Sequence, residues 1–550
     1  MARNMSDPVA APNPPSTRET RILTVDPSKI GRISWRGSEE TLRDPWHLDP
    51  RDDWVLELDE NSPDAARLRE AAAHLRTTDI PVAFPTETVY GLGADATRSS
   101  AVQGIYRAKQ RPSDNPLIVH VCSLAQLRSL IHPSPAPHAQ FNNKGASQNG
   151  DNDNNDPIPT IYHPLIRRFW PGPLTILLPL PSPSPLAPEV TSTLQTFGAR
   201  LPSSLLALAL IHAASKPLAA PSANASTKPS PTTAQHVLHD LNGRIEIILD
   251  GGPCSVGVES TVVDGLSNPP CVLRPGGISI DQLRSCPGWE KVVIGYKDAP
   301  QIGDKAPRAP GMKYKHYSPR AAVILFEGCS AGDSAGAGVS NGNKQRPGPY
   351  PLSPAFIRRY IGDKTHIGII TTKFWTPPFQ PGAEMTKYPS LPPASTTSSS
   401  SPTSSSLPLL SETTPALLPH NVITQHLALC SSSPKGLGQD QDQDGEKMLQ
   451  IRSIALGAST AEIARGLFSA LRALDELRVD VILVEGISDD DEATAADDGD
   501  GGHESGSGSG SGSGRGSDSA KDSSRGGGGD IAAAVMNRLR KAAGEVVRLG

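Results

Sequence analysis

Three cations stand at alternate positions in the stretch "RAKQRPSDNPLIVH" (107–120). Pro112 disfavours a helical conformation for Arg111. Lys109 and Arg111 could therefore converge from an extended segment, whereas Arg107 would stay on the surface of a helix. Two converging cations suit a phosphate chain, because arginine donates bidentate hydrogen bonds and lysine supplies a point charge. The alternative is a solvated helix end, where the helix dipole favours cations, and charge spacing alone favours this alternative.

Polar side chains also follow several apolar stretches that predict strands. In "FPTETVYGLGADA" (84–96), Thr86 and Thr88 come after a strand and before a glycine-rich turn. Ligands bind at such strand ends in open α/β sheets. Further strand-end motifs carry Thr196, Arg200, Ser222, Asn224, Ser260 and Arg274. Taken singly, each motif is more typical of an ordinary loop than of a site.

Taken together, these motifs predict a site that positions its substrates. The chain shows no recognisable serine–histidine–aspartate triad, no carboxylate pair for acid–base work, no GxGxxG and no Walker A loop. Phosphoryl and nucleotidyl transfer depend mainly on positioning and charge stabilisation, so they fit this pattern.

The elements around these motifs alternate between helical and strand patterns. "DAARLREAAAHLR" (64–76) predicts a helix that Asp64 could cap, and strands are expected over 80–86 and 115–122. Ser123 opens another helix. Much later, Ser459 and Glu462 form the pattern of a capping box before a long amphipathic helix. This rhythm predicts α/β domains.

Composition divides the 550 residues into folded regions and low-complexity segments. Hydrophobic residues make up 37%, with 54 prolines and 50 glycines, which favours folded domains interrupted by disordered inserts. We expect a polar N-terminal extension (1–53), a first domain (54–297), a linker (298–320) and a second domain (321–550). We expect disorder at 133–160, 328–350, 376–446 and 489–530.

The overall charge and the cysteines narrow the class of protein. The net charge of −5 disfavours a general nucleic-acid binder. The six cysteines form no CxxC pair, so we expect no zinc site, and their scatter is typical of reduced cytosolic thiols. No apolar run is long enough to predict a membrane span. We expect a cytoplasmic protein and leave open an additional mitochondrial location.

The motifs in order resemble the Sua5/YrdC/YciO family, in its two-domain Sua5 form. The matching pieces are "PTETVYGLG", "KQRPSDNPLIVH", "WPGPLT", "APSANAS", "GVESTVVD", "RPG" and "PGMKYKHYSP", and the tail "ILVEG…AVMNRLRKAA" resembles the end of the family's C-terminal domain. The resemblance implies an N-terminal twisted mixed-sheet α/β domain with a concave basic face, and a Rossmann-like C-terminal domain. It also implies an enzyme, a nucleotidyltransferase that makes threonylcarbamoyl-AMP and pyrophosphate from L-threonine, bicarbonate or CO2, and ATP.

The resemblance assigns roles to individual positions. Lys109 and Arg111 would be the catalytic cations. The expected ATP contacts are Arg111, Asn115, Thr196, Asn224, Thr232, Arg274 and Tyr317. The expected threonine contacts are Thr86, Thr88, His120, Arg200, Ser222 and Ser260. Mg²⁺ is expected with ATP, held largely by phosphates and water and without a tight protein metal site.

The resemblance also implies partners, and two other functions stay open. A downstream complex would transfer the product's threonylcarbamoyl group to adenosine 37 of tRNAs that read ANN codons, forming t6A, and a weak contact with RNA is conceivable. One alternative is a non-catalytic module of the same fold that binds tRNA or double-stranded RNA. The negative net charge of the chain and its low share of aromatic residues, 4%, disfavour this alternative. The other is a carbamoyl-adenylate enzyme that acts on a different amine or acid.

Overall fold

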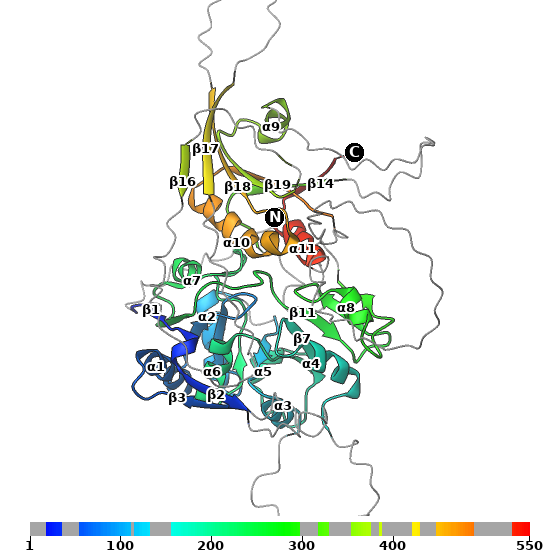
Figure 1. Cartoon of the computed structure of the whole chain (residues 1–550). Helices are drawn as coiled ribbons and strands as arrows, with labels where there is room; N and C mark the ends of the chain where they lie inside the picture. Colours follow the sequence, from blue (N-terminus) through cyan, green and yellow to red (C-terminus); the bar gives the residue numbers. More distant parts are fainter. Residues whose placement is uncertain are drawn as a thin grey trace, which may run out of the picture.

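The structure is a computed structural model of the whole chain (Figure 1). It describes residues 18–35, 54–111, 115–132, 156–296, 317–328, 354–373, 375, 384–387, 421–429, 447–488 and 531–549. These residues form two α/β domains, one on each side of residue 317.

An 11-stranded mixed sheet is the centre of the N-terminal domain. Its spatial order is β1-β10-β4-β5-β9-β6-β8-β7-β11-β12-β13, with both parallel and antiparallel neighbours. The strands are β1 (Arg21–Thr24), β4 (Val82–Phe84), β5 (Gly91–Asp95), β6 (Ile118–His120), β7 (Leu174–Pro179), β8 (Thr196–Arg200), β9 (Leu218–Ala219), β10 (Ile247–Asp250), β11 (Thr261–Asp264), β12 (Cys271–Arg274) and β13 (Val293–Ile294). The expected mixed-sheet α/β fold is confirmed.

Helices cover this sheet and begin at residues with local capping signals. Ser123 caps α3, as expected, but the helix at 64 is capped by Ser62, whose hydroxyl accepts from the Ala65 amide, while Asp64 lies inside the first turn. The helices are α1 (Pro63–Thr77), α2 (Ser99–Lys109), α3 (Leu124–Ile131), α4 (His163–Phe169), α5 (Pro188–Thr191), α6 (Leu205–Ala214), α7 (Ala234–Leu241) and α8 (Ile280–Arg284), with 3-10 turns η1 (Pro27–Lys29) and η4 (Thr160–Tyr162).

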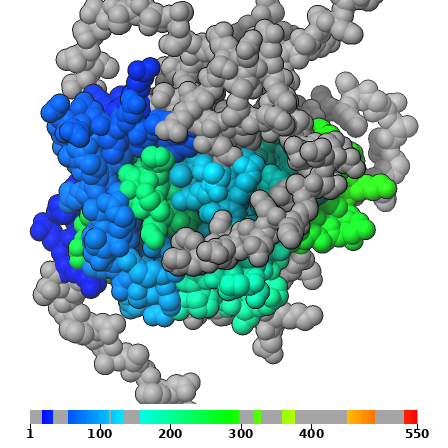
Figure 2. Space-filling view, turned by 90° about the horizontal axis from the view of Figure 1, so that it is seen from below, coloured from blue at the N-terminus to red at the C-terminus, as the bar shows by residue number. Residues whose placement is uncertain are grey.

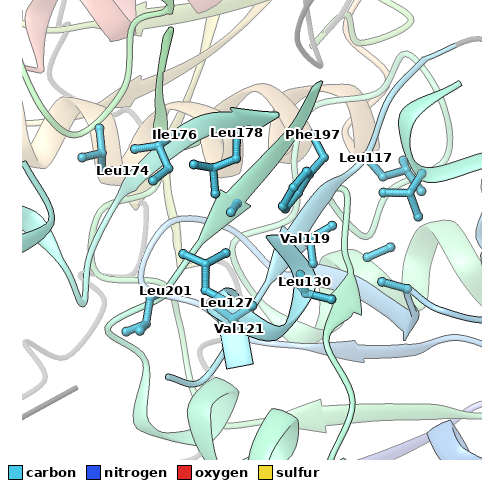
Figure 3. Packing of buried hydrophobic residues seen from close by; sticks show 14 of the residues in the cluster. Leu117, Val119, Val121, Leu127, Leu130, Leu174, Ile176, Leu178, Phe197 and Leu201 are labelled. Atoms are coloured by element: carbon cyan, nitrogen blue, oxygen red, sulfur yellow. The ribbon is translucent and has the colours of Figure 1, made fainter. Parts of the chain in front are cut away.

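Two apolar cores sandwich the sheet, because successive side chains of a strand point to opposite faces. In β4, Ala83 joins one core, whereas Val82 and Phe84 join the other. The first core packs β6, β7 and β8 against α3, and Figure 3 shows Val119, Leu127 and Ile176 among its members. The second core packs α1 and α6 against the opposite face. This packing holds the strand ends, and therefore the loops that follow them, in fixed places.

The stretch predicted as a polar N-terminal extension contributes to the fold. β1 pairs in parallel with β10 at the edge of the main sheet, and β2 (Gly31–Trp35) pairs with β3 (Trp54–Leu58) in a separate two-stranded sheet. The prediction is therefore wrong for residues 18–35. The short apolar run "RILTV" was overlooked because polar residues surround it. It pairs with a strand that lies more than 200 residues later in the chain.

The C-terminal domain contains a seven-stranded sheet in the order β16-β17-β18-β15-β19-β14-β20. From β18 to β20 all neighbours are parallel, as in a Rossmann-like fold. The elements are β14 (Ala322–Gly328), β15 (His366–Thr371), β16 (Glu384–Lys387), β17 (Asn421–Leu429), β18 (Lys447–Ala455), β19 (Val481–Glu485), β20 (Glu545–Leu549), α9 (Pro354–Ile361), α10 (Thr460–Glu476) and α11 (Ala532–Ala542). The Ser459–Glu462 capping box is confirmed.

One predicted disordered insert contains regular structure. β16 and β17 lie within 376–446 and extend the C-terminal sheet in antiparallel fashion, so disorder is wrong for these two segments. The Pro- and Ser-rich residues between them masked the strand pattern of "NVITQHLAL". The end of the predicted 133–160 insert is also described, and disorder is wrong for 156–160, where Ile158 is buried and Asp156 pairs with Arg128. The remaining parts of the predicted inserts lie outside the described residues, as do residues 298–316 of the predicted linker; these parts are 133–155, 329–350, 376–383, 388–420, 430–446 and 489–530.

Helices α10 and α11 lie between the C-terminal sheet and the N-terminal domain (Figure 1). The side chains of α10 are buried on nearly all sides, because one face packs on its own sheet and the other meets the N-terminal domain. Val89 and Val258 of the N-terminal domain belong to the same apolar cluster as α10 and α11. Figure 2 shows the molecule from below, where the coloured surface is formed by segments of the N-terminal domain, blue to green. In the described part of the chain, no helix is long and apolar enough to cross a membrane.

Candidate active site

The loops that follow the strand ends are joined to one another by backbone hydrogen bonds. The amides of Val256 and Gly257 donate to the carbonyls of Glu87 and Thr88, at 2.8 and 3.1 Å. The amide of Ala223 donates to the Tyr90 carbonyl at 2.8 Å. Three motifs that are far apart in the sequence thus form one continuous floor, beneath α10 and α11.

The buried side chain of Lys109 contacts one of these loops, at residues 222–224. It is the last residue of α2, is 2% exposed, and its Nζ donates to the carbonyls of Ser222 and Asn224, the latter at 2.8 Å. Burial, and then the neighbouring charge of Arg111, lower the pKa of Lys109 well below its usual range. Ser222 therefore enters the site through its carbonyl group.

Arg107 is exposed and donates to the Ser100 carbonyl of its own helix, as the division between site and surface predicted. The sequence argument placed Lys109 on an extended segment, but Lys109 lies in a helix. The helix ends at Gln110, whose left-handed backbone (φ 52°) turns the chain, and Arg111 follows half-buried. Arg107 and Lys109 both lie on α2, where residues two positions apart do not share a face, so the helix itself separates them. The turn at Gln110 separates Arg111 from the helix.

A second group surrounds Arg200 at the end of β8. Its guanidinium is 4% exposed and donates to the Thr88 hydroxyl at 2.9 Å, to Glu87 Oε1 at 2.6 Å and to the Gly172 carbonyl at 3.3 Å. The Thr86 and Thr88 hydroxyls are 2.8 Å apart. The predicted Thr86, Thr88 and Arg200 are therefore brought together.

His120 ends β6 and stands in register with Arg200 on the neighbouring strand. Its Nδ1 lies 3.3 Å from the Ile118 carbonyl, and its ring meets Phe84 edge-on. Burial, and then the charge of Arg200, lower the pKa of His120 to about 3. His120 is therefore a neutral, polar side chain at physiological pH.

A third group surrounds Arg274 at the end of β12. Its guanidinium donates to the Ser260 carbonyl and hydroxyl, at 2.9 and 3.0 Å, and the Ser260 hydroxyl lies 2.8 Å from that of Thr175. Burial is the main cause that lowers the pKa of Arg274, to about 10. Tyr317 lies close enough to affect that pKa, and burial followed by the charge of Glu259 raises the pKa of Tyr317 to about 12.

The remaining predicted ATP contacts differ in how they are engaged. The Asn224 amide donates to the carbonyls of Ala225 and Lys228, so it organises its own loop. Asn115 is 1% exposed, and neither polar atom of its side chain has a partner among the described residues. Such an orphaned amide is uncommon in folded proteins.

Thr196 and Thr232 lie at two other borders of the site. Thr196 lines a pocket with apolar neighbours that include Pro116, directly after Asn115. Thr232 is buried, and its hydroxyl lies 3.2 Å from that of Ser469 on α10. Thr232 is thus tied to the C-terminal domain, which its sequence motif did not indicate.

Sequence reasoning missed several charged residues of the site. Glu87 pairs with Arg200, and Glu259 pairs with Arg538 of α11 at 3.0 Å. Both glutamates stand beside a selected hydroxyl residue at a strand end, and that position was the available signal. Asp240 and Arg472, which pair at 2.8 Å, carried no comparable signal.

Within the described ranges, no group of three or more His, Cys, Asp or Glu residues could hold a metal ion. The two buried glutamates nearest the predicted contacts are each engaged with an arginine. The donor set therefore suits an anionic ligand better than a bare cation.

Comparisons with known proteins show which family this chain belongs to. The family described as "Telomere recombination" (Sua5, YciO and YrdC) matches residues 75–276, and the "Threonylcarbamoyl-AMP synthase, C-terminal domain" family matches residues 278–498. The threonylcarbamoyl-AMP synthase of Schizosaccharomyces pombe is 51% identical over 56% of this chain and 72% of its own length. That of Bacillus subtilis is 46% identical over 50% and 71%. A solved structure of Pyrococcus abyssi Sua5 complexed with L-threonine is 30% identical, with a TM-score of 0.55 over 90% of this chain and 98% of its own.

Proposed function

Because this chain belongs to the Sua5/YciO/YrdC family, we propose that it is a threonylcarbamoyl-AMP synthase. It would convert L-threonine, bicarbonate or CO2, and ATP into threonylcarbamoyl-AMP and pyrophosphate. The observation that carries the proposal is the presence of three buried cations at the ends of elements of one domain: Lys109 on α2, Arg200 on β8 and Arg274 on β12. Buried cations are costly unless they are paired, so their presence favours anionic substrates.

Threonine would bind beside Arg200. A guanidinium has five N–H donors, and three hydrogen bonds of Arg200 are made within the protein. The remaining donors can bind a carboxylate. The Thr86 and Thr88 hydroxyls and the neutral His120 suit a small polar side chain. The solved complex of the similar Pyrococcus abyssi Sua5 with L-threonine supports threonine as the substrate.

ATP would bind toward Arg274. Arg274, Arg111 and Lys109 would offset charge on the phosphates, and the orphaned amide of Asn115 can donate to and accept from a polar ligand such as a nucleobase. Thr196, Thr232, Asn224 and Tyr317 complete the proposed contacts. Mg²⁺ would accompany the nucleotide, with phosphate oxygens and water as its ligands.

The chemistry would proceed by positioning. The threonine amine attacks CO2, or bicarbonate with loss of water, to form a carbamate. A carbamate oxygen then attacks the α-phosphorus of ATP, and the bond to the bridging oxygen breaks to release pyrophosphate. Arg274 and Lys109 would stabilise the charge that develops on the phosphates.

The product would serve tRNA modification. A downstream transferase complex would move the threonylcarbamoyl group to adenosine 37 of tRNAs that read ANN codons. The labile carbamate needs protection from water. A cytoplasmic location, with a mitochondrial one in addition, also belongs to this proposal.

One measurement separates the proposal from its alternatives. Pyrophosphate release is followed with threonine, with serine and without an amino acid, each in the presence of bicarbonate and Mg-ATP. We expect release with threonine far above the other two conditions. Equal release with serine would indicate a different amine substrate. Salt-dependent tRNA binding without any pyrophosphate release would indicate the RNA-binding module.

A further inference from the structure

Two arginines of the C-terminal domain reach into the loops of the candidate site. Arg538 of α11 is 1% exposed, and its Nε pairs with Glu259 Oε2 at 3.0 Å. Another guanidinium nitrogen donates to the Pro275 carbonyl at 2.5 Å, and the guanidinium lies 5.9 Å from the ring centre of Tyr317. Glu259 and Pro275 are direct neighbours of Ser260 and Arg274 in the chain.

Arg472 of α10 makes a similar contact with the loop that follows Asn224. It is 5% exposed, pairs with Asp240 at 2.8 Å and donates to the Pro229 carbonyl. Asp240 also binds Lys228 at 3.1 Å and accepts from the Ala225 amide at 3.3 Å. The loop that follows Asn224 is thereby attached to α10 through one carboxylate.

Helix α10 also lies close to the site loops at Gly257. A side chain at Gly257 (φ 82°) would collide with the backbone of Arg465 on α10, and Arg465 donates to the Ser255 carbonyl at 3.1 Å. The Thr232 and Ser469 hydroxyls meet across the same boundary. By contrast, the side-chain hydrogen bonds of Arg200, Thr86 and Thr88 described above all lie within the N-terminal domain.

We propose that Arg538 and Arg472 are positioning residues, through which the C-terminal domain sets the nucleotide side of the site. This inference rests on the proposed function. Arg538 holds the 259–260 and 274–275 segments together beneath Tyr317, and Arg472 holds the 225–229 loop beside Asn224. The group of Arg200, Thr86 and Thr88 on the threonine side keeps its geometry without them, because its hydrogen bonds close within one domain. Ser260 lies in the segment that Arg538 holds, so it is counted with the nucleotide side. A displacement of about 1 Å at a reacting group can lower rates about 100-fold, so small shifts of these loops would be visible.

The test compares full-length variants on the same helix. Arg538→Gln removes the contact with Glu259, and Arg540→Gln, two residues later, removes a 2.6 Å ion pair with Glu327 inside the C-terminal domain. Arg472→Gln tests the second arginine. KM and kcat are measured for ATP and for threonine, and calorimetry with ATP alone and with threonine alone gives binding without turnover.

We expect Arg538→Gln and Arg472→Gln to raise KM for ATP and to weaken ATP binding at least about tenfold. Threonine binding should change less than about twofold, and Arg540→Gln should resemble the wild type. Arg538→Lys keeps the charge beside Glu259 but cannot also hold the Pro275 carbonyl. It should recover part of the ATP affinity, and it decides the question if Arg538→Gln does not fold.

Three results would overturn the inference: equal losses for ATP and threonine, an equal loss in Arg540→Gln, or unchanged ATP binding in Arg538→Gln and Arg472→Gln. If wild-type protein released no pyrophosphate at all, the proposed function would fail. The calorimetric comparison would still decide whether the two arginines set the nucleotide side.

Discussion

Two buried arginine–glutamate pairs support the candidate site, and their partners come from different places. Arg200 and Glu87, 2.6 Å apart, both belong to the N-terminal domain, whereas Glu259 of that domain meets Arg538 of the C-terminal domain at 3.0 Å. The first pair exists once one sheet has formed. The second needs two domains to dock. The difference teaches that the proposed threonine side is complete within one domain, whereas the proposed nucleotide side is shared.

The largest expected effect comes from breaking the pair within one domain. Arg200→Met leaves Glu87 buried without its cation, so we expect the free energy of unfolding to fall by about 3–5 kcal/mol. Pyrophosphate release should fall at least about 100-fold. Denaturant unfolding and the release assay measure both. The control is Arg284→Met, which removes an exposed pair with Asp281 and should change stability by less than about 1 kcal/mol. A stable, active Arg200→Met variant would refute the assignment.

The next effect concerns Lys109, which lies between the two sides. Lys109→Met removes a buried cation that holds the carbonyls of Ser222 and Asn224, so we expect a loss of pyrophosphate release of about 100-fold. Arg107→Met is the matched control on the same helix, and its exposed side chain should matter less than about twofold. Equal losses in the two variants would contradict the division between site and surface.

A smaller effect should separate the two substrates. Thr88→Val keeps the shape of the side chain but removes the acceptor of the 2.9 Å bond from Arg200. A lost hydrogen bond to a charged group costs about 1.5 kcal/mol, so KM for threonine should rise about tenfold while KM for ATP stays unchanged. Thr77→Val serves as the control, because it removes an exposed hydroxyl at the end of α1. A rise in KM for ATP instead would show that the two sides are not separate.

The smallest expected effect is a pH dependence that belongs to the threonine side. The pKa of folded His120 is about 3, below the ordinary 6.5, so the unfolded state binds more protons as the pH falls below about 6.5. Stability should therefore decrease from pH 6.5 downward, toward pH 3. Between pH 7 and 5.5 this contribution is about 1 kcal/mol.

The variant His120→Gln should lack this contribution. Its free energy of unfolding should fall less between pH 7 and 5.5 than that of the wild type, as denaturant titrations at the two pH values would show. Lys291→Gln, at an exposed position, should keep the wild-type difference. The same pH dependence in His120→Gln would show that another group causes it.

The sequence predicted the members of the site better than their contacts. Thr86, Thr88 and Arg200 were selected because they follow strands, and the structure places them within hydrogen-bonding distance of one another. The alternation argument for Lys109 assumed an extended segment, and this conformation is wrong, because Lys109 is the last residue of α2. Gln110 adopts a left-handed backbone, and the sequence offered no glycine or asparagine there to announce it.

Helix α10 shows the same limit. Its apolar stripe of Ile463, Leu467 and Leu471 was predicted from periodicity and is buried. Arg472 lies outside this stripe, yet it is also buried, because it meets a second domain. Periodicity shows that a helix has one apolar face, but it does not show what covers the other.

By itself, the sequence determined what neighbouring residues decide among themselves: the Ser459–Glu462 cap, the helical stripes, the strands and the polar residues at their ends. Only the tertiary structure decided that β1 joins the main sheet, that β17 lies inside a low-complexity region, and that Arg538 meets Glu259. The physical reason is distance along the chain. A cap forms within one turn, whereas the Arg538–Glu259 contact joins residues 279 positions apart and forms only after two domains have folded and docked.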